Sequence, residues 1–134
     1  MKELAFRLTR GDDLRLSIEE YCAHYDVDTA VVLSAVGSLF DVSLRLADAE
    51  KFLHIEKDFE IVSLTGTISR SEAHLHISLS DENGDCIGGH LIEGCLVNTT
   101  CEVVLGILEY YRSIRKYDDY TGYDEISFQE VEND

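Results

Sequence analysis

Several common features are absent from this sequence. It has no proline, no internal repeat and no linker-like stretch, so we expect a single domain over residues 1–134. Its longest apolar run, Ala30 to Val36, contains a serine and is far too short to cross a bilayer. No basic and then apolar leader follows Met1, and the four cysteines lack C-x-x-C spacing. We therefore expect a cytoplasmic protein whose cysteines are buried thiols rather than disulfides.

Positive charge is also scarce. The chain has 11 lysines and arginines against 27 aspartates and glutamates, which gives a formal net charge of −16. Affinity for a phosphate backbone comes largely from basic side chains, so this composition disfavours direct binding to nucleic acid. Hydrophobic residues make up 45% of the chain, which is enough for a folded core.

The apolar pattern predicts an α+β fold, mainly antiparallel β-sheet with one main amphipathic helix. Gly11 to Asp13 supply a turn and an N-cap. Apolar residues then recur at helical spacing as far as Tyr25. Most of the remaining chain has the composition of strands, with a continuous buried strand expected at Thr29–Val36. The other predicted strands are residues 5–8, 42–46, 59–69 and 100–110, besides the hairpin described next.

The tail after Tyr117 is acidic and rich in tyrosine. We expect part of it to pack against the domain and residues 129–134 to fray. The residues expected to pack are Tyr120, Tyr123, Ile126 and Phe128.

The segment from His74 to His90 has the pattern of a β-hairpin. Asp81 to Asp85 fits a three-residue loop, in which a type I turn is followed by Gly84 in the left-handed region. That loop pairs His76 with His90, and His74 faces the same side as His76. A two-residue Asn-Gly turn would instead place His90 on the opposite, apolar face. The first register separates polar from apolar side chains, so it is the one we predict.

Three imidazoles on one face at these separations can bind one divalent metal ion. The spacing predicts His74, His76 and His90 as ligands, with zinc as the expected metal. Three protein nitrogens leave a coordination position for water or a substrate oxygen, which is typical of catalytic zinc. The alternative is that one or two of these histidines only hydrogen-bond to neighbouring serines.

Two carboxylates are candidates for a catalytic role beside the metal. Glu102 lies in an apolar strand, where a buried carboxylate needs a partner or a site to serve. Glu93 follows the third histidine and could act as a base, although a solvated loop carboxylate is an equal alternative. A cleft lined by Glu102, or by an arginine such as Arg45, would favour chemistry. Cys86 falls on the histidine face but lies nearer the turn than the histidines.

Several sequence blocks occur in order along the chain and form a recognisable set. They are Gly11-Asp12-Asp13-Leu14, Ser34-Ala35-Val36-Gly37-Ser38-Leu39, Phe59-Glu60-Ile61-Val62-Ser63-Leu64-Thr65-Gly66, His74-Leu75-His76-Ile77-Ser78-Leu79, Gly88-Gly89-His90-Leu91 and Asp119-Tyr120-Thr121-Gly122-Tyr123. Together they resemble the plants-and-prokaryotes-conserved (PPC) domain, which plants fuse to AT-hook DNA-binding segments. The resemblance covers roughly Phe6 to Ile126 and includes the histidine hairpin.

The resemblance implies a homotrimer and, in stand-alone prokaryotic members, a zinc-like metal on the residues that match His74, His76 and His90. Two functions remain open. The first is a small-molecule-binding protein or metal-dependent enzyme. The second is a non-catalytic oligomerisation or regulatory module that meets a protein partner. Members of the family are sometimes labelled as DNA-binding, but this chain has no AT-hook and the wrong charge.

Overall fold

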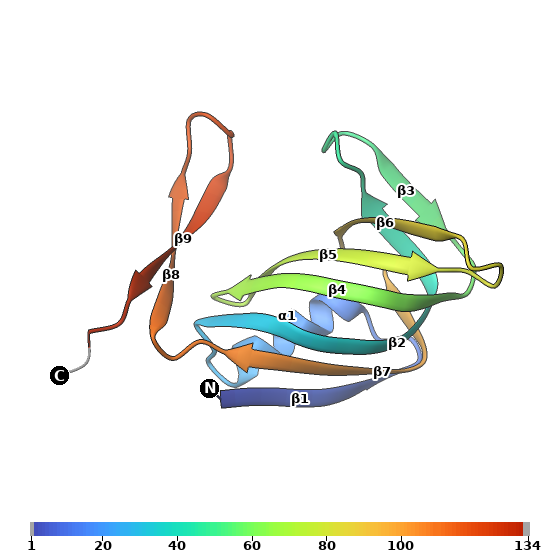
Figure 1. Ribbon diagram of the computed structural model, residues 1–134, viewed down its shortest axis with the longest axis horizontal. Coiled ribbons are helices and arrows are strands. Elements are labelled where there is room, and N and C mark those ends of the chain that lie inside the picture. The colour runs from blue at the N-terminus through green and yellow to red at the C-terminus, as the bar shows by residue number, and fades with distance from the viewer. Residues whose placement is uncertain (1, 133–134) are drawn as a thin grey trace.

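The computed structural model describes residues 2–132, which fold mainly as antiparallel β-sheet with one helix (Figure 1). Seven strands form the main sheet in the order β1-β7-β2-β4-β5-β6, with β3 paired to β2, and β8 and β9 form a separate two-stranded sheet. The elements are β1 (Lys2–Thr9), α1 (Leu14–His24), β2 (Thr29–Arg45), β3 (Phe52–Ile55), β4 (Phe59–Ser69), β5 (Glu72–Ser80), β6 (Cys86–Leu91), β7 (Leu96–Ile107), β8 (Tyr111–Tyr117) and β9 (Asp124–Glu130). The predicted fold class is confirmed.

Strand β2 is a single strand of 17 residues, where the sequence pattern predicted two. Gly37 does not end it, because the backbone of β7 lies directly against this glycine. A Cβ at Gly37 would lie 2.4 Å from the carbonyl oxygen of Thr100, so a side chain here would push β7 away. Gly37 therefore serves a close approach of two backbones within the sheet and does not mark a strand end.

The bend of β2 brings its end to the histidine hairpin. Three register shifts interrupt its pairing with β7, and such irregularities bend a strand. Its first part pairs with β4, whereas its last two residues, Leu44 and Arg45, pair with Leu91 and His90 of β6. Arg45 is thereby held next to a histidine that lies far from it in the sequence.

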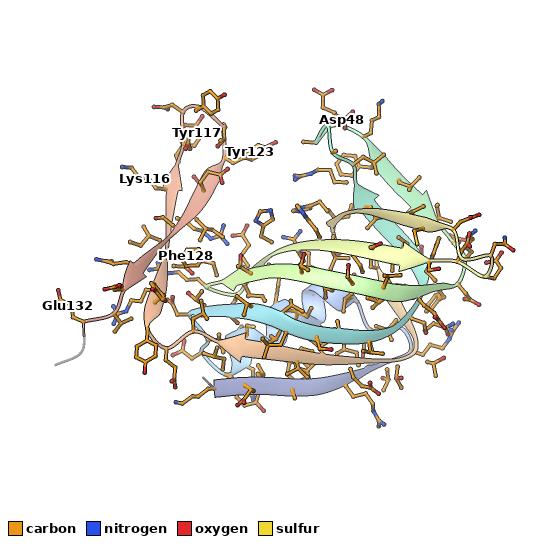
Figure 2. All side chains as sticks on the ribbon, in the orientation of Figure 1. Asp48, Lys116, Tyr117, Tyr123, Phe128 and Glu132 are labelled. Carbon is orange, nitrogen blue, oxygen red and sulfur yellow. The ribbon has the colours of Figure 1, made fainter. Side chains whose placement is uncertain are left out.

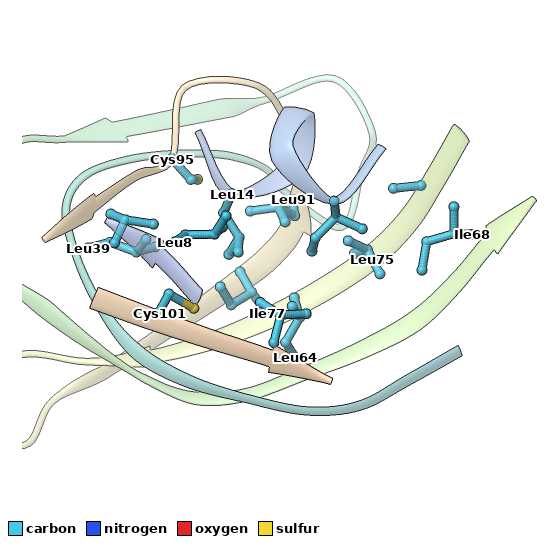
Figure 3. Close-up of a cluster of buried hydrophobic side chains, with 14 of the residues drawn as sticks. Leu8, Leu14, Leu39, Leu64, Ile68, Leu75, Ile77, Leu91, Cys95 and Cys101 are labelled. Carbon is cyan, nitrogen blue, oxygen red and sulfur yellow. The ribbon is translucent and has the colours of Figure 1, made fainter. Parts of the chain in front are cut away.

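Helix α1 covers one face of the sheet and supplies part of the core. Asp13 is its N-cap, and the Asp13 carboxylate accepts a hydrogen bond from the Leu16 N–H at 3.0 Å. Leu14, Ile18 and Cys22 are fully buried in the cluster shown in Figure 3, which also holds Leu75 and Leu91 of the histidine hairpin. The last predicted helix position is wrong: Tyr25 is the C-cap and is 57% exposed.

The face of the sheet away from α1, here called the open face, carries exposed side chains. Strand β5 alternates as expected, with Leu75 and Ile77 buried on the α1 side and His74 and His76 exposed on the open face. Strand β2 was expected to be continuously buried up to Val36, but this is wrong. Val36 lies opposite Glu102 of β7 and is 59% exposed.

The C-terminal region forms a hairpin that the sequence analysis did not predict. Strands β8 and β9 pair from Tyr111–Glu130 to Tyr117–Asp124 and project to one side of the main sheet (Figure 1). The Val131 N–H donates a hydrogen bond to the Tyr110 carbonyl at the end of this hairpin. Residues 133 and 134 lie outside the described residues.

The aromatic side chains of this hairpin were expected to pack against the domain, but they do not. Tyr120 is 98% exposed, and Tyr123 and Phe128 are about half exposed. Figure 2 shows Tyr117 and Tyr123 near the turn of the hairpin. The hairpin is held at its base, where the Ser113 N–H donates a hydrogen bond to Asp28 at 3.0 Å.

Two further expectations concern the cysteines, which were expected to be buried thiols, and the possibility of a membrane-spanning segment. Cys22, Cys95 and Cys101 are buried free thiols, as predicted, whereas Cys86 is free but exposed. Burial raises the pKa of the three buried thiols to about 11. Among the described residues, no helix has the length and apolar character needed to cross a membrane.

Candidate metal centre

The histidine hairpin has the register that its turn residues predicted. His76 lies directly opposite His90, and Leu79 lies opposite Ile87. Gly84 has a φ of 81°, in the left-handed region, and the Asp81 N–H donates a hydrogen bond of 2.9 Å to the Asp85 carbonyl. The alternative register, with His90 on the apolar face, is wrong.

Three imidazoles converge on the open face as a result. The ring centroids of His74 and His76 lie 5.3 Å apart, those of His74 and His90 5.5 Å, and those of His76 and His90 5.6 Å. One nitrogen from each ring can be chosen so that all three lie within 4.8 Å of one another. Nitrogens this close can bind a single ion, since Zn–N bonds are about 2.0–2.1 Å long.

The surroundings of His74 and His90 favour the neutral forms of these two rings. Burial, followed by the positive charge of Arg45, lowers the pKa of His90 to about 4. Burial also lowers the pKa of His74, and the neighbouring His76 adds to that effect. A neutral imidazole is the form that binds a metal.

His90 provides a direct test of whether these residues suit a metal. Its Nδ1 atom is buried and has no hydrogen-bond partner among the described residues. A buried polar atom without a partner is costly, and a bound ion, a water or a ligand group would compensate for it. The donor set also fits, because three imidazole nitrogens are typical ligands of zinc and related transition metals.

A cavity of about 570 Å³ adjoins two of the three histidines. It lies where β2, β4, β5 and β6 come together. Within residues 2–132, no acidic residue lines this cavity. His74 is not among the lining residues. The polar side chains on its wall are Arg45, Ser63, Thr65, His76, Ser78 and His90.

Gly88 and Gly89 form part of this wall because strands meet closely there. A Cβ on Gly89 would lie 2.8 Å from the carbonyl oxygen of Arg45, and one on Gly88 would lie 2.7 Å from that of Ile77. The pair lets β6 approach the backbones of β2 and β5. This close packing holds His90 beside both Arg45 and His76.

The two candidate catalytic carboxylates lie away from the cavity of their own chain. Glu102 is exposed on β7 rather than buried as predicted, and two strands separate β7 from β5 in the sheet. Glu93 is exposed in the turn between β6 and β7. Neither lines the cavity, whereas Arg45 does.

Three further side chains that could bind a metal, those of Cys86, His24 and His54, lie outside the three-histidine cluster. Cys86 is exposed at the start of β6 and does not join the group of nitrogens. His24 is exposed in the last turn of α1. The Nε2 atom of His54 lies 2.6 Å from the Asp41 carboxylate. With Glu56 these two form a second group of side chains that could hold an ion, in which His54 and Glu56 are exposed and Asp41 is half-buried.

Sequence reasoning missed the contribution of β4 to the site. Ser63 and Thr65 line the cavity, and they lie opposite Ser78 and His76 of β5. Their alternation with Leu64, which is buried, was the available signal that they face the histidines.

The fold and the histidine hairpin correspond to a known family. The sequence model of the Plants and Prokaryotes Conserved (PCC) domain, the domain also abbreviated PPC, matches residues 1–109. The chain therefore belongs to the PCC domain family, as its sequence motifs indicated.

Individual relatives extend this result. The chain is 39% identical to Bifunctional protein GlmU from Synechococcus sp. (strain JA-2-3B'a(2-13)), over 100% of this chain and 21% of that protein. It thus spans about a fifth of the length of the curated relatives it matches.

Two solved structures are similar over nearly the whole chain. A hypothetical protein from Salmonella cholerae-suis (Salmonella enterica) is 33% identical with a TM-score of 0.91, covering 96% of this chain and 94% of that one. A metal-containing protein from Archaeoglobus fulgidus is 28% identical with a TM-score of 0.80, covering 98% of this chain and 94% of that one.

Proposed function

We propose that this PCC-domain protein binds one divalent metal ion, with zinc as the expected metal, through His74, His76 and His90. The metal would serve a small-molecule ligand or substrate in the adjoining cavity. One observation carries the proposal: three imidazole nitrogens lie within 4.8 Å of one another, and two of these histidines, His76 and His90, line a cavity to which residues 2–132 contribute no acidic side chain. The similar Archaeoglobus fulgidus protein is described as metal-containing, which supports the same conclusion.

The chain's own residues would position the ligand. A divalent metal on three neutral nitrogens would supply Lewis-acid chemistry, by polarising a ligand oxygen or activating water. Arg45, Ser63 and Thr65 line the cavity and present hydrogen-bond donors to its interior. The buried β5 residues Leu75 and Ile77, next to the histidines in the sequence, hold the strand rigidly against the core.

Elemental analysis of zinc-loaded and dialysed protein tests the metal proposal. We expect one zinc per wild-type chain and a loss of stoichiometric zinc in His76→Ala, which removes one of three ligands. His24→Ala is the matched control, because His24 is an exposed histidine on the helix, and this variant should retain its zinc. Stoichiometric zinc in folded His76→Ala would overturn the proposal.

We also propose that the protein is a homotrimer, as its family resemblance implies. Large apolar side chains of β2 and β4 support an association surface. Leu33 is 49% exposed, and Val36 and Val62 are both 59% exposed. Burial of such residues between subunits would remove apolar surface from water.

A second candidate function is a non-catalytic oligomerisation or regulatory module that meets a protein partner. The match to about a fifth of Bifunctional protein GlmU favours this candidate, because the same domain type there forms part of a much longer chain. Turnover is not required for such a module, and the metal would be structural or sensory. Direct DNA binding remains disfavoured, because 27 acidic residues face only 11 basic ones.

A further inference from the structure

Arg45 stands out among the residues of the cavity wall. It is the only lining residue with a formal charge among the described residues, in a chain whose net charge is −16. It is the last residue of β2 and is paired with His90 of β6. A single positive charge is thus held beside the proposed metal site.

The Arg45 guanidinium has no counterion within residues 2–132. Its Nε atom is buried and has no hydrogen-bond partner there, and the described ion pairs do not include it. Other partly buried arginines do have partners: Arg15 lies 3.6 Å from the Glu19 carboxylate, and Arg115 lies 3.5 Å from that of Glu72. A partly buried cation without an anion is costly, so Arg45 is a group that a bound anion would stabilise.

The remaining wall suits a small polar ligand. Ser63, Thr65 and Ser78 line the cavity, and a hydroxyl can donate or accept a hydrogen bond. No side-chain hydrogen bond within the described structure occupies these three hydroxyls, in contrast to Ser38 and Thr29, whose hydroxyls donate to Asn98 and Asp28. The volume of about 570 Å³ lies within the usual range for small-molecule sites.

We propose that the cavity binds a small monocarboxylate, with the carboxylate on the Arg45 guanidinium. This inference deepens the proposed metal function. It rests on that function only for a second contact of the ligand, the one with the metal ion. A carboxylate matches the planar fork of an arginine with two parallel hydrogen bonds. A single negative charge is favoured over two or three, because the acidic surface of this chain repels ligands in proportion to their charge.

Titration of zinc-loaded protein with propionate at constant ionic strength tests the inference. The measurement is the NMR shift of the His76 and His90 ring signals.

The wild type and Arg7→Gln should show saturable shifts with propionate and none with propylammonium. Arg7 is the matched control, because it is exposed on β1 at the far edge of the sheet and its loss changes the net charge equally. In Arg45→Gln the propionate affinity should fall roughly tenfold or more. Arg45→Lys keeps the charge but loses the planar fork of the guanidinium, so its propionate affinity should lie between those of the wild type and Arg45→Gln.

The outcomes separate this inference from the metal proposal. Equal propionate affinity in Arg45→Gln and Arg7→Gln would overturn the carboxylate site, as would an unsaturable response in the wild type. Tighter binding of inorganic phosphate than of propionate would also overturn it. The zinc content of each sample is measured in parallel. A wild type that keeps its zinc but ignores propionate contradicts only the carboxylate site, whereas a wild type that holds no zinc contradicts the metal proposal. The metal-free wild type should still bind propionate more tightly than metal-free Arg45→Gln.

Discussion

His76 and His90 are directly opposed partners on β5 and β6, and their ring centroids lie 5.6 Å apart. The loop from Asp81 to Asp85 fixes this pairing, and the buried residues of β5 fix which face the rings share. His74 joins them because it lies two residues before His76 on the same strand. One hairpin of local sequence therefore presents all three proposed ligands.

Replacement of Leu75 by alanine should lower the stability of the metal-free protein more than replacement of the neighbouring ligand candidate His76. Leu75 is 1% exposed, so truncation leaves a cavity and should lower the free energy of unfolding by about 2–5 kcal/mol. His76 is exposed, so His76→Ala should change metal-free stability by less than Leu75→Ala. Urea denaturation of metal-free protein measures both. A larger stability loss in His76→Ala would contradict the assignment of the two faces.

The loop of the hairpin should contribute to stability in a pH-dependent way. A hydrogen bond from the Lys57 ammonium at 2.9 Å, and the N–H groups of Asn83 and Asp85, lower the pKa of Asp81 from its usual 3.8. The unfolded chain therefore takes up this proton first as the pH falls. The stabilisation is present above pH 3.8 and is lost as the pH falls through the lowered pKa of the folded state.

Denaturation of Asp81→Asn at about pH 7 and at about pH 2 tests this expectation. Asp81→Asn should be less stable than the wild type at the higher pH, and the difference should shrink at the lower pH. Asp85→Asn is the control, because Asp85 is exposed in the same loop and its carboxylate accepts none of the described hydrogen bonds. A difference between Asp81→Asn and the wild type that does not change with pH would contradict the account.

Substitution of Gly89 by alanine should disturb the junction of β2 and β6. The new Cβ would lie 2.8 Å from the Arg45 carbonyl oxygen, so the two strands must move apart. We expect lower stability and weaker zinc binding, since His90 is the next residue. Cys86→Ala is the control: Cys86 lies on the same strand and is exposed, so its replacement should change neither the stability nor the zinc binding. Unchanged zinc affinity in Gly89→Ala would show that the β2–β6 contact does not position His90.

The proposed trimer has its own test. Sedimentation equilibrium should give a mass three times the 15.1 kDa of one chain. Val36→Asp places a charge on the open face and should weaken the assembly, whereas Tyr120→Asp, at a residue that is 98% exposed, should not. A wild-type mass of 15.1 kDa at micromolar concentration would contradict the trimer.

Local chemistry made the histidine hairpin predictable from the sequence. Gly84 in the loop determined the register, and the alternation of Leu75 and Ile77 with the histidines determined the faces. The N-cap at Asp13 was predictable for the same reason, since a capping carboxylate acts on its own helix turn.

Long-range packing set the features that the sequence did not reveal. The pairing of Arg45 with His90 depends on three register shifts along β2, and no local pattern encodes where such a bent strand ends. Glu102 was predicted to be buried because its neighbours in sequence are apolar, but alternate residues of β7 face the open side of the sheet, and Glu102 is exposed there. The β8–β9 hairpin was missed because its mixture of charged and aromatic residues lacks an apolar alternation.

X-ray absorption spectroscopy of the zinc-loaded protein tests the central claim most directly, because it reports the atoms around the metal. The account predicts a shell of imidazole nitrogens at about 2.0–2.1 Å with no sulfur in it. His90→Ala should lose one nitrogen from that shell or release the zinc. A sulfur shell at about 2.3 Å, or an all-oxygen shell that is unchanged in His90→Ala, would contradict a centre built from His74, His76 and His90.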